Sequence, residues 1–270
     1  MKGELRFISI LWLMLVCTIA LHAVRAKQSH EIRKYVRVNG HRLYVRCDGR
    51  GLPVVVLEAG LDANSASFSA VQPDVARFTT VCSYDRLNLG QSEHADGVRT
   101  SQASVDDLHV LLTELKLRKP YVLVGASMGG IIVRIFAQRY PDESAGIVLL
   151  DSTPEDLVAR YSAVLTSEQL IQTFAGKNIE QIDVKKSLSE ALATRWRRDI
   201  PLLVLTHDPA LGRPPIEREQ AWEQMQAELA TRSDKGKLRI VYGSSHVMTR
   251  DKPQAIVHAI HETVMMVRSQ

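Results

Sequence analysis

The stretch YVLVGASMGG, residues 121–130, decides the fold. Its first four residues form a short apolar run, which is typical of a strand buried on both faces of a parallel sheet. The glycines after this run favour a tight turn into a helix, which we expect to continue to about Arg139. A buried strand that passes directly into a helix is the repeating unit of a largely parallel sheet covered by helices on both faces.

The rest of the chain repeats this alternation of strand and helix. Further strands are predicted at Val54–Leu57, Thr79–Tyr84, Ile147–Leu150, Leu202–Leu205 and Leu238–Tyr242, and helices at about Val105–Leu115 and Pro253–Val267. Alternating residues over Glu31–Asp48 predict an antiparallel hairpin that turns at Asn39-Gly40. Residues 152–199 show only helical patterns, so we interpret them as a small helical cap. We therefore predict one α/β domain over residues 27–270, with the cap inserted at about 152–199.

The first 26 residues differ from this body. Lys2 and Arg6 precede an uninterrupted apolar run over 7–24, a pattern that indicates an export signal or a single membrane anchor. Cleavage and retention are both open, so we expect an exported protein that is periplasmic, secreted or tethered by this segment. The body carries no basic stripe with interleaved aromatic residues, although the net charge is +4. Nucleic acid is therefore not an expected partner.

Ser127 lies in the turn, inside the pattern Gly-x-Ser-x-Gly. The turn is so tight that both flanking positions must be small, and glycine there lets the backbone take a strained conformation that lifts the hydroxyl to the top of the sheet. The helix that begins at Met128 directs its first amides to the same point. A phosphate-binding loop is the competing interpretation, but no lysine follows the glycines. We therefore predict that Ser127 is a nucleophile.

His246 is the best candidate for the base that a serine nucleophile needs. It follows the last predicted strand and precedes the last helix, so it reaches the same carboxyl edge of the sheet as Ser127. Of the other histidines, His258 and His261 share a face of the final helix, where a solvated pair is a simpler interpretation than a metal site. We therefore predict that His246 takes the proton from Ser127.

A second loop reaches the same edge. It follows the strand that begins at Val54, and it is placed to offer the amide of Leu61 beside the amide of Met128. Two such donors would stabilise the negative charge that develops on an attacked carbonyl oxygen. The alternative is that Gly60 only permits a turn in this loop.

Together these features resemble the α/β-hydrolase superfamily, specifically its bacterial esterase-like branch of the AB hydrolase-1 type, from about Val36 to Val267. The resemblance rests on the following residues: Leu57-Glu58-Ala59-Gly60, Tyr84-Asp85-Arg86, Gly90-Gln91-Ser92, the serine turn, and Trp222 with Gln226 in a helix before His246. Two positions depart from the pattern. Asn88 stands where relatives usually have glycine, and Ser245 stands where glycine often precedes the histidine.

The resemblance implies a serine, acid and histidine triad in that chain order, no cofactor, and hydrolysis of a carboxylic ester or related acyl bond through an acyl-enzyme. Two residues compete for the acid. Asp151 directly follows one predicted strand, and Asp208 follows the next strand along the chain. The superfamily more often places its acid after the later strand, but the segment before Asp208 is shorter than usual, so Asp151 is slightly preferred. The alternative roles are a helix cap for Asp151 and a turn residue for Asp208.

Two other functions fit the same residues. A cofactor-free perhydrolase or haloperoxidase would use the same triad, and a non-catalytic binding protein would keep only the fold. Dehalogenase chemistry fits less well, because it uses a carboxylate in place of the serine. The sequence does not identify the small-molecule ester or acyl substrate.

A disulfide is also expected if the chain is exported. Removal of Cys17 with the leader would leave Cys47 and Cys82 as a pair in an oxidising compartment. In the fold implied by the resemblance, the second strand, which carries Cys47, lies beside the fourth, which carries Cys82. We therefore predict a bridge between them.

Overall fold

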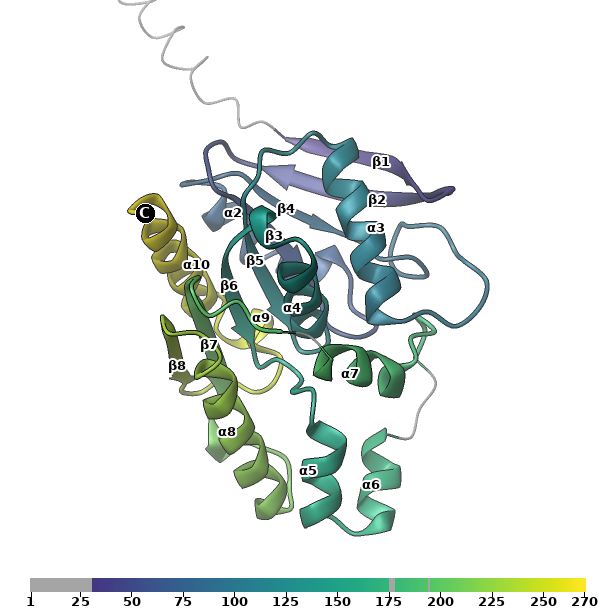
Figure 1. Ribbon diagram of the computed structural model, residues 1–270, viewed down its shortest axis with the longest axis vertical. Coiled ribbons are helices and arrows are strands. Elements are labelled where there is room, and N and C mark those ends of the chain that lie inside the picture. Colours follow the sequence, from purple (N-terminus) through teal and green to yellow (C-terminus); the bar gives the residue numbers. More distant parts are fainter. Residues whose placement is uncertain (1–30, 175–177, 194) are drawn as a thin grey trace, which may run out of the picture. The chain divides into compact units, whose positions relative to one another are not determined.

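The computed structural model describes residues 31–174, 178–193 and 195–270, and shows a central sheet of eight strands (Figure 1). The strand order is β1-β2-β4-β3-β5-β6-β7-β8. The strands span Ile32–Val38 (β1), His41–Asp48 (β2), Val54–Glu58 (β3), Val81–Tyr84 (β4), Tyr121–Ala126 (β5), Ser144–Leu150 (β6), Leu202–His207 (β7) and Gly236–Val241 (β8). β2 runs antiparallel to β1 and β4, and the other neighbours pair in parallel. The predicted α/β-hydrolase fold with a mostly parallel sheet is confirmed.

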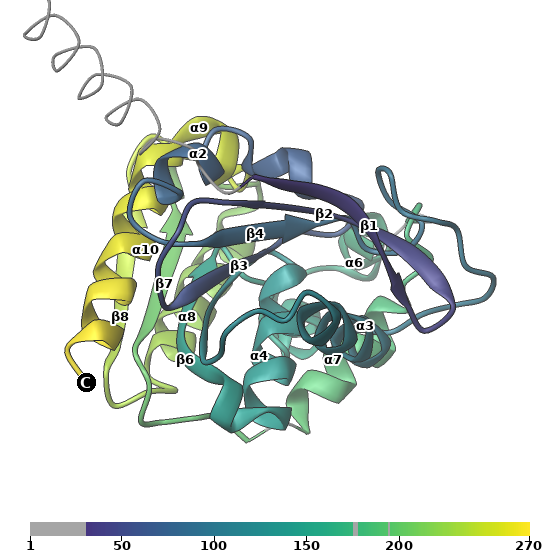
Figure 2. The same cartoon turned by 90° about the horizontal axis from the view of Figure 1, so that it is seen from above.

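Helices cover both faces of the sheet. They span Gln72–Val75 (α2), Ser101–Glu114 (α3), Gly129–Arg139 (α4), Leu157–Val164 (α5), Ser167–Phe174 (α6), Val184–Leu192 (α7), Ile216–Ala230 (α8), Met248–Asp251 (α9) and Pro253–Arg268 (α10). Seen from above, α2 and α10 lie on one face, and α3 and α4 lie on the other (Figure 2). Each face has its own apolar core, because the central strands bury the side chains of both faces.

Several predicted boundaries differ from the structure, including the start of β6, which lies at Ser144 and not at Ile147. The strand expected from Thr79 begins at Val81, and the strand expected from Leu238 begins two residues earlier. The second shift arises because β8 is the edge strand and four of its six residues are exposed, so its first half lacks an apolar pattern. The helix expected from Val105 begins at Ser101, where the Thr100 side chain accepts a hydrogen bond from an amide of the first turn.

The amino-terminal strands match the prediction closely. The hairpin of β1 and β2 turns at Asn39 and Gly40, whose φ angles of 49° and 91° are those that a two-residue hairpin turn requires. In the antiparallel pair of β2 and β4, Cys47 lies directly opposite Cys82. The predicted disulfide between them is present, with an S–S distance of 2.08 Å.

The segment expected to form the cap contains α5, α6 and α7. α5 packs on α8 through a small apolar cluster that includes Leu157, Tyr161 and Trp222. α7 instead contacts α3 and α4. Within the described part of residues 152–199, no residue belongs to the central sheet. The leader predicted at 1–26 lies outside the described residues.

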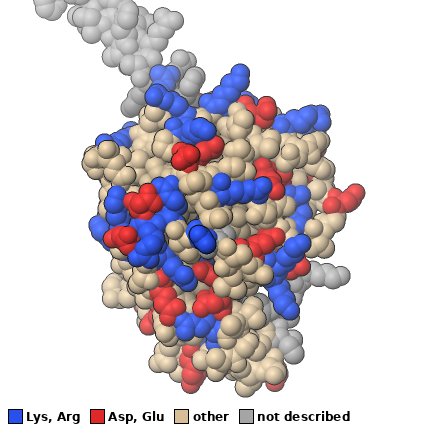
Figure 3. All heavy atoms as spheres, viewed as in Figure 1, with Lys and Arg blue, Asp and Glu red and all other residues tan. Residues whose placement is uncertain are grey.

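The described surface is of mixed charge. Basic and acidic side chains lie intermingled over the face drawn in Figure 3. Many of them are paired, as where Lys237 and Arg239 both reach Glu262. Among the helices that the structure describes, none is long and apolar enough to cross a bilayer.

Candidate active site

Ser127 occupies a strained turn between β5 and α4. Its φ angle is 49°, in the left-handed region that a residue with a side chain rarely adopts. The strain therefore lies on the serine itself. The sequence analysis had assigned the strained conformation to the flanking glycines. The glycines serve close packing instead, because a Cβ on Gly125 would lie 2.6 Å from the carbonyl oxygen of Gly129, and one on Gly129 would lie 2.4 Å from that of Ala59.

Ser127, His246 and Asp151 form a continuous chain of polar contacts. The Nε2 atom of His246 lies 3.1 Å from the Oγ atom of Ser127. On the other side of the ring, Nδ1 lies 2.5 Å from Oδ2 of Asp151. The three residues follow β5, β8 and β6, which are parallel strands whose carboxyl ends meet at one edge of the sheet. This geometry is the one that a serine nucleophile, its histidine base and an orienting acid require.

Asp151 is fully buried and its carboxylate accepts several hydrogen bonds. Besides the histidine contacts, Oδ1 accepts from the Trp222 indole at 2.9 Å and from the Thr206 hydroxyl at 3.0 Å. Burial alone would raise the pKa of Asp151, but the hydrogen bonds and charges of His207 and His246 hold the pKa well below its usual range. Asp151 is therefore a carboxylate at neutral pH.

Asp208, the competing acid, faces other partners. Its Oδ1 accepts a hydrogen bond from the amide of Ala210 at 3.0 Å, and its Oδ2 accepts one from the amide of Gly243 at 2.8 Å. These two backbone bonds lower the pKa of Asp208. Asp208 thus caps the short 3₁₀ turn Pro209–Leu211. In the structure, the carboxylate that contacts the ring of His246 is that of Asp151 and not that of Asp208.

His207 is a site residue that the sequence analysis missed. Its Nδ1 lies 2.8 Å from Oδ2 of Asp151, and its Nε2 lies 2.9 Å from Oε1 of Glu219. Burial alone would lower the pKa of His207, but the hydrogen bond and charge of Asp151, together with Glu219, raise it to about 9. The sequence did offer one signal for this residue, a histidine at the end of a strand next to the site. Its second partner, Glu219, belongs to a helix further along the chain, so the contact could not be predicted.

Two side chains of α8 contact Asp151 and the residue that follows it. Trp222 reaches the Asp151 carboxylate, and Gln226, one turn further on, donates to the carbonyl of Ser152 at 2.8 Å. Both side chains are buried. These contacts give a physical reason for the tryptophan and glutamine noted in the sequence, because they fix the loop that follows β6.

The loop that carries Leu61 lies against the serine. A Cβ on Gly60 would lie 3.4 Å from the Cβ of Ser127. Within the described residues, the amides of Leu61 and Met128 donate to no protein acceptor. The loop is therefore close enough to the nucleophile to contribute to an oxyanion hole, and both of these amides are free to donate.

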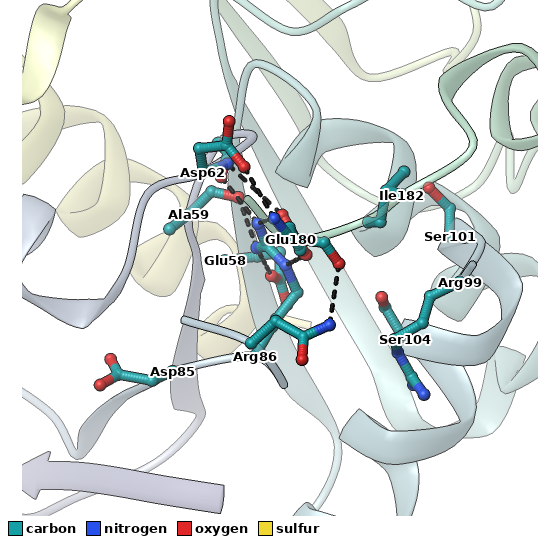
Figure 4. Close-up of polar contacts among 12 residues, drawn as sticks. Glu58, Ala59, Asp62, Asp85, Arg86, Arg99, Ser101, Ser104, Glu180 and Ile182 are labelled. Carbon is teal, nitrogen blue, oxygen red and sulfur yellow. Dashed lines mark hydrogen bonds and ion pairs between the residues drawn. The ribbon is translucent and has the colours of Figure 1, made fainter. Parts of the chain in front are cut away.

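Arg86 holds this loop from below (Figure 4). Its guanidinium donates to the carbonyl oxygens of Ala59 and Gly60 at 2.8 and 2.7 Å. It also pairs with two buried carboxylates, those of Glu58 and Glu180. Burial alone would lower the pKa of Arg86, but both carboxylates raise it, so the group stays charged. The loop beside Ser127 is thus anchored by a buried, fully paired cation.

Glu180 links the same loop to the segment between α6 and α7. Its backbone amide donates to Oδ1 of Asp62 at 3.0 Å, and its carbonyl accepts from the side chain of Asn88 at 3.1 Å.

Asn88, which replaces the glycine usual in relatives, has a φ of 72°, and Asn tolerates that conformation better than most residues. The other departure, Ser245, bonds through its amide and hydroxyl to Asp251.

A pocket opens beside the serine, with a cavity volume of about 260 Å³. Its walls come mainly from α5, α8 and the segment between β7 and α8, and its lining includes Leu157, Tyr161, Leu211, Arg213, Arg218 and Trp222. The guanidinium of Arg218 lies 5.3 Å from the ring centre of Tyr161. Within the described residues, neither Arg213 nor Arg218 forms an ion pair. The pocket therefore combines apolar walls with two arginines that form no ion pair and with the carboxylates of Asp151 and Glu219.

Comparison with known proteins agrees with this fold. Residues 53–164 match the family model described as the alpha/beta hydrolase fold. The chain is similar to the uncharacterized protein YqjL of Bacillus subtilis, with 25% identity over 77% of this chain and 82% of that protein. It is 33% identical to the sn-1-specific diacylglycerol lipase ABHD11 of Mus musculus, but over only 38% of this chain and 34% of the lipase.

Solved structures are similar over most of the chain. A thermophilic esterase from Thermogutta terrifontis superimposes with a TM-score of 0.63 at 21% identity, covering 87% of this chain and 99% of the esterase. A haloalkane dehalogenase loop variant from Bradyrhizobium elkanii gives a TM-score of 0.67 at 18% identity, covering 89% of this chain and 98% of the dehalogenase. At these identities the likeness establishes the fold alone. The reaction has to be inferred from the residues of the site.

Proposed function

We propose, from the premise that this chain is a protein of the α/β-hydrolase fold, that it is a serine hydrolase that cleaves a carboxylic ester. The observation that carries the proposal is the chain of contacts from Ser127 through His246 to Asp151, with distances of 3.1 and 2.5 Å. The dehalogenase compared above shares the fold, but dehalogenase chemistry is expected to need a carboxylate at the position where this chain has Ser127.

Each member of the triad has one role in the reaction. The Oγ atom of Ser127 attacks the ester carbonyl carbon while Nε2 of His246 takes the hydroxyl proton, and the amides of Leu61 and Met128 stabilise the oxyanion. His246 then gives this proton to the departing alcohol, which leaves an acyl-enzyme. Water then attacks the acyl carbonyl carbon with His246 again as the base. The bond to Oγ of Ser127 breaks, the acid is released, and His246 returns the proton to Oγ. Asp151 keeps the proton of the neutral ring on Nδ1 and stabilises the imidazolium.

The pocket supports an ester that carries an acidic group. Arg213 and Arg218 add positive charge to its lining, and the apolar side chains of Leu157 and Leu211 suit a short hydrocarbon segment. A carboxylate on the substrate would pair with a guanidinium at the pocket wall while the ester group reaches Ser127. We therefore expect short acyl chains that end in a carboxylate to be preferred over neutral chains of equal length.

Export is a separate proposal. The charged and apolar pattern of residues 1–26 supports it, and so does the disulfide between Cys47 and Cys82, because disulfides persist mainly in oxidising compartments. The protein would then work outside the cytoplasm, either free or tethered through its N-terminal segment. Sequencing the N-terminus of the protein recovered from its native host separates these two states, and recovery of the protein with free thiols in the cytosol would contradict export.

The substrate proposal is tested with matched aryl esters. We expect the purified protein to hydrolyse p-nitrophenyl butyrate, and the p-nitrophenyl monoester of glutaric acid with a higher kcat/KM. The preference should fall about threefold in Arg218→Gln, the scale expected for one partly exposed charge, whereas exposed Arg77→Gln is the control and should not change it. Turnover that requires peroxide would favour a perhydrolase, and no turnover of any ester would favour a binding protein.

A further inference from the structure

Two histidines share one carboxylate oxygen beside the nucleophile. Nδ1 of His246 and Nδ1 of His207 lie 2.5 and 2.8 Å from the same Oδ2 atom of Asp151. Only His246 also reaches the hydroxyl of Ser127. A triad needs one histidine, so the presence of a second on the same oxygen requires its own explanation.

The surroundings of His207 exclude it as a base. Both ring nitrogens face carboxylates, because Nε2 lies 2.9 Å from Oε1 of Glu219 on α8. The side chain is only 8% exposed. The contact with Glu219 is an ion pair without hydrogen-bond geometry, because Oε1 of Glu219 has no hydrogen-bond partner among the described residues. The imidazolium carries a charge that pairs with both carboxylates, whereas the neutral ring carries none. The geometry therefore favours a ring that is permanently charged at neutral pH.

We propose, resting on the function proposed above, that His207 is a positioning residue for the reaction. Held as an imidazolium between Asp151 and Glu219, it fixes the Asp151 carboxylate in the orientation that His246 needs. It also offsets part of the carboxylate charge. The positive charge of His207 disfavours protonation of His246 and so keeps His246 available as a base.

The sign of this effect follows from electrostatics. Protonation of His246 places a second positive charge close to His207, because both rings contact the same oxygen atom. Like charges this close repel, so the charge of His207 disfavours protonation of His246. The raised pKa of His207, about 9, supports its being charged at neutral pH.

Other charged groups face His207 from the elements packed around it. They are Asp151 after β6, Arg218 and Glu219 on α8, Arg213 before α8, Asp208 after β7 and His246 after β8, and the neutral phenol of Tyr161 on α5 lies in the same pocket. Changing one residue at a time leaves the rest of this set in place. A comparison of single variants therefore isolates the charge of His207.

The test uses two variants of the full chain that change the local charge in opposite directions. His207→Gln keeps a side-chain amide able to donate to Asp151 but removes a positive charge, so the acid limb of the kcat/KM profile against pH should move up by about one unit. Glu219→Gln removes a negative charge, so the limb should move down. A structural role for His207 would lower kcat/KM at all pH values without moving the limb. That result, or shifts of the same sign in both variants, would overturn the proposal.

A second measurement does not depend on activity. In ¹⁵N NMR spectra of the full chain, the ring of His207 should be doubly protonated at pH 7.5 and titrate near pH 9, and the midpoint should fall in Glu219→Gln. A neutral ring at pH 7.5 would overturn the inference even if the protein hydrolyses esters. A charged ring in a protein that hydrolyses no ester would instead refute the proposed function, and with it the positioning role.

Discussion

Oδ2 of Asp151 lies 2.5 Å from Nδ1 of His246, although the two residues are 95 positions apart in the chain. The contact arises because β6 and β8 flank β7 and all three end at the same edge of the sheet. Asp208, which follows β7, is closer to His246 in sequence, but both of its carboxylate oxygens accept hydrogen bonds from backbone amides.

These different partners predict different effects of the same substitution. Asp151→Asn should lower kcat by about 10⁴, because the amide no longer holds the correct tautomer of His246 or stabilises its imidazolium. Asp208→Asn should keep most of kcat and cost about 1 kcal/mol in the free energy of unfolding, as expected for a capping residue. Steady-state kinetics and urea unfolding of both variants measure this. Near-normal turnover in Asp151→Asn would transfer the acid role to Asp208.

The stability that His207 contributes should depend on pH. Its pKa rises from an ordinary value of about 6.5 to about 9 in the folded protein. The folded state therefore binds more protons than the unfolded state, so the contribution is complete below about pH 6.5 and is lost as pH rises through 9. The gap in unfolding free energy between wild type and His207→Gln should shrink by at most about 3 kcal/mol from pH 6 to 9.5. A gap that stays constant in urea titrations would show that the ring is not charged.

The anchoring of the oxyanion loop predicts a role for Glu180 in turnover. Glu180→Gln removes one of the two carboxylates on Arg86, which should loosen the loop at Ala59 and Gly60 and lower kcat by about tenfold or more. The matched control is Glu190→Gln, because Glu190 also lies within residues 152–199. Its carboxylate accepts the backbone amide of Gln102 at 2.9 Å, as that of Glu180 accepts the amide of Asp62 at 3.4 Å. Equal kcat values in the two variants would contradict the coupling of the cap segment to the loop.

Local patterns were sufficient to locate Ser127 and His246. The serine stands at a strand-to-helix turn and the histidine follows the last strand, so the order of elements alone brings them to one edge of the sheet. The need for small residues beside the serine was predicted correctly, but the strained conformation was assigned to the glycines and lies on Ser127. Whether a glycine serves a positive φ or close packing depends on neighbours such as the carbonyl of Ala59. Such neighbours belong to another strand.

The acid and His207 needed the three-dimensional structure. Asp151 and Asp208 both follow strands of the same sheet, and what separates them is the buried set of donors around Asp151, including Trp222 from α8. His207 becomes informative only because Glu219, on that same helix, faces its second nitrogen. Side-chain contacts of this kind join residues that are far apart in sequence, and no local pattern records them.

The disulfide should stabilise the protein by restricting its unfolded state. The bridge closes a loop with a sequence separation of 35 between Cys47 and Cys82, for which the chain-entropy model gives about 4 kcal/mol. Urea unfolding of the oxidised wild type and of the double variant Cys47→Ala with Cys82→Ala should differ by about this amount. Alkylation of two free thiols in the unreduced, denatured protein would show that the bridge does not form.

The central claim is that Ser127 is the nucleophile, and labelling with a fluorophosphonate probe tests it most directly. The probe reacts only with an activated serine, so the account predicts one label on the wild type, mapped by mass spectrometry to Ser127, and none on folded Ser127→Ala. Ester hydrolysis should fall in that variant by about 10⁶. Labelling that persists in Ser127→Ala, or a wild type that takes up no label, would contradict the account.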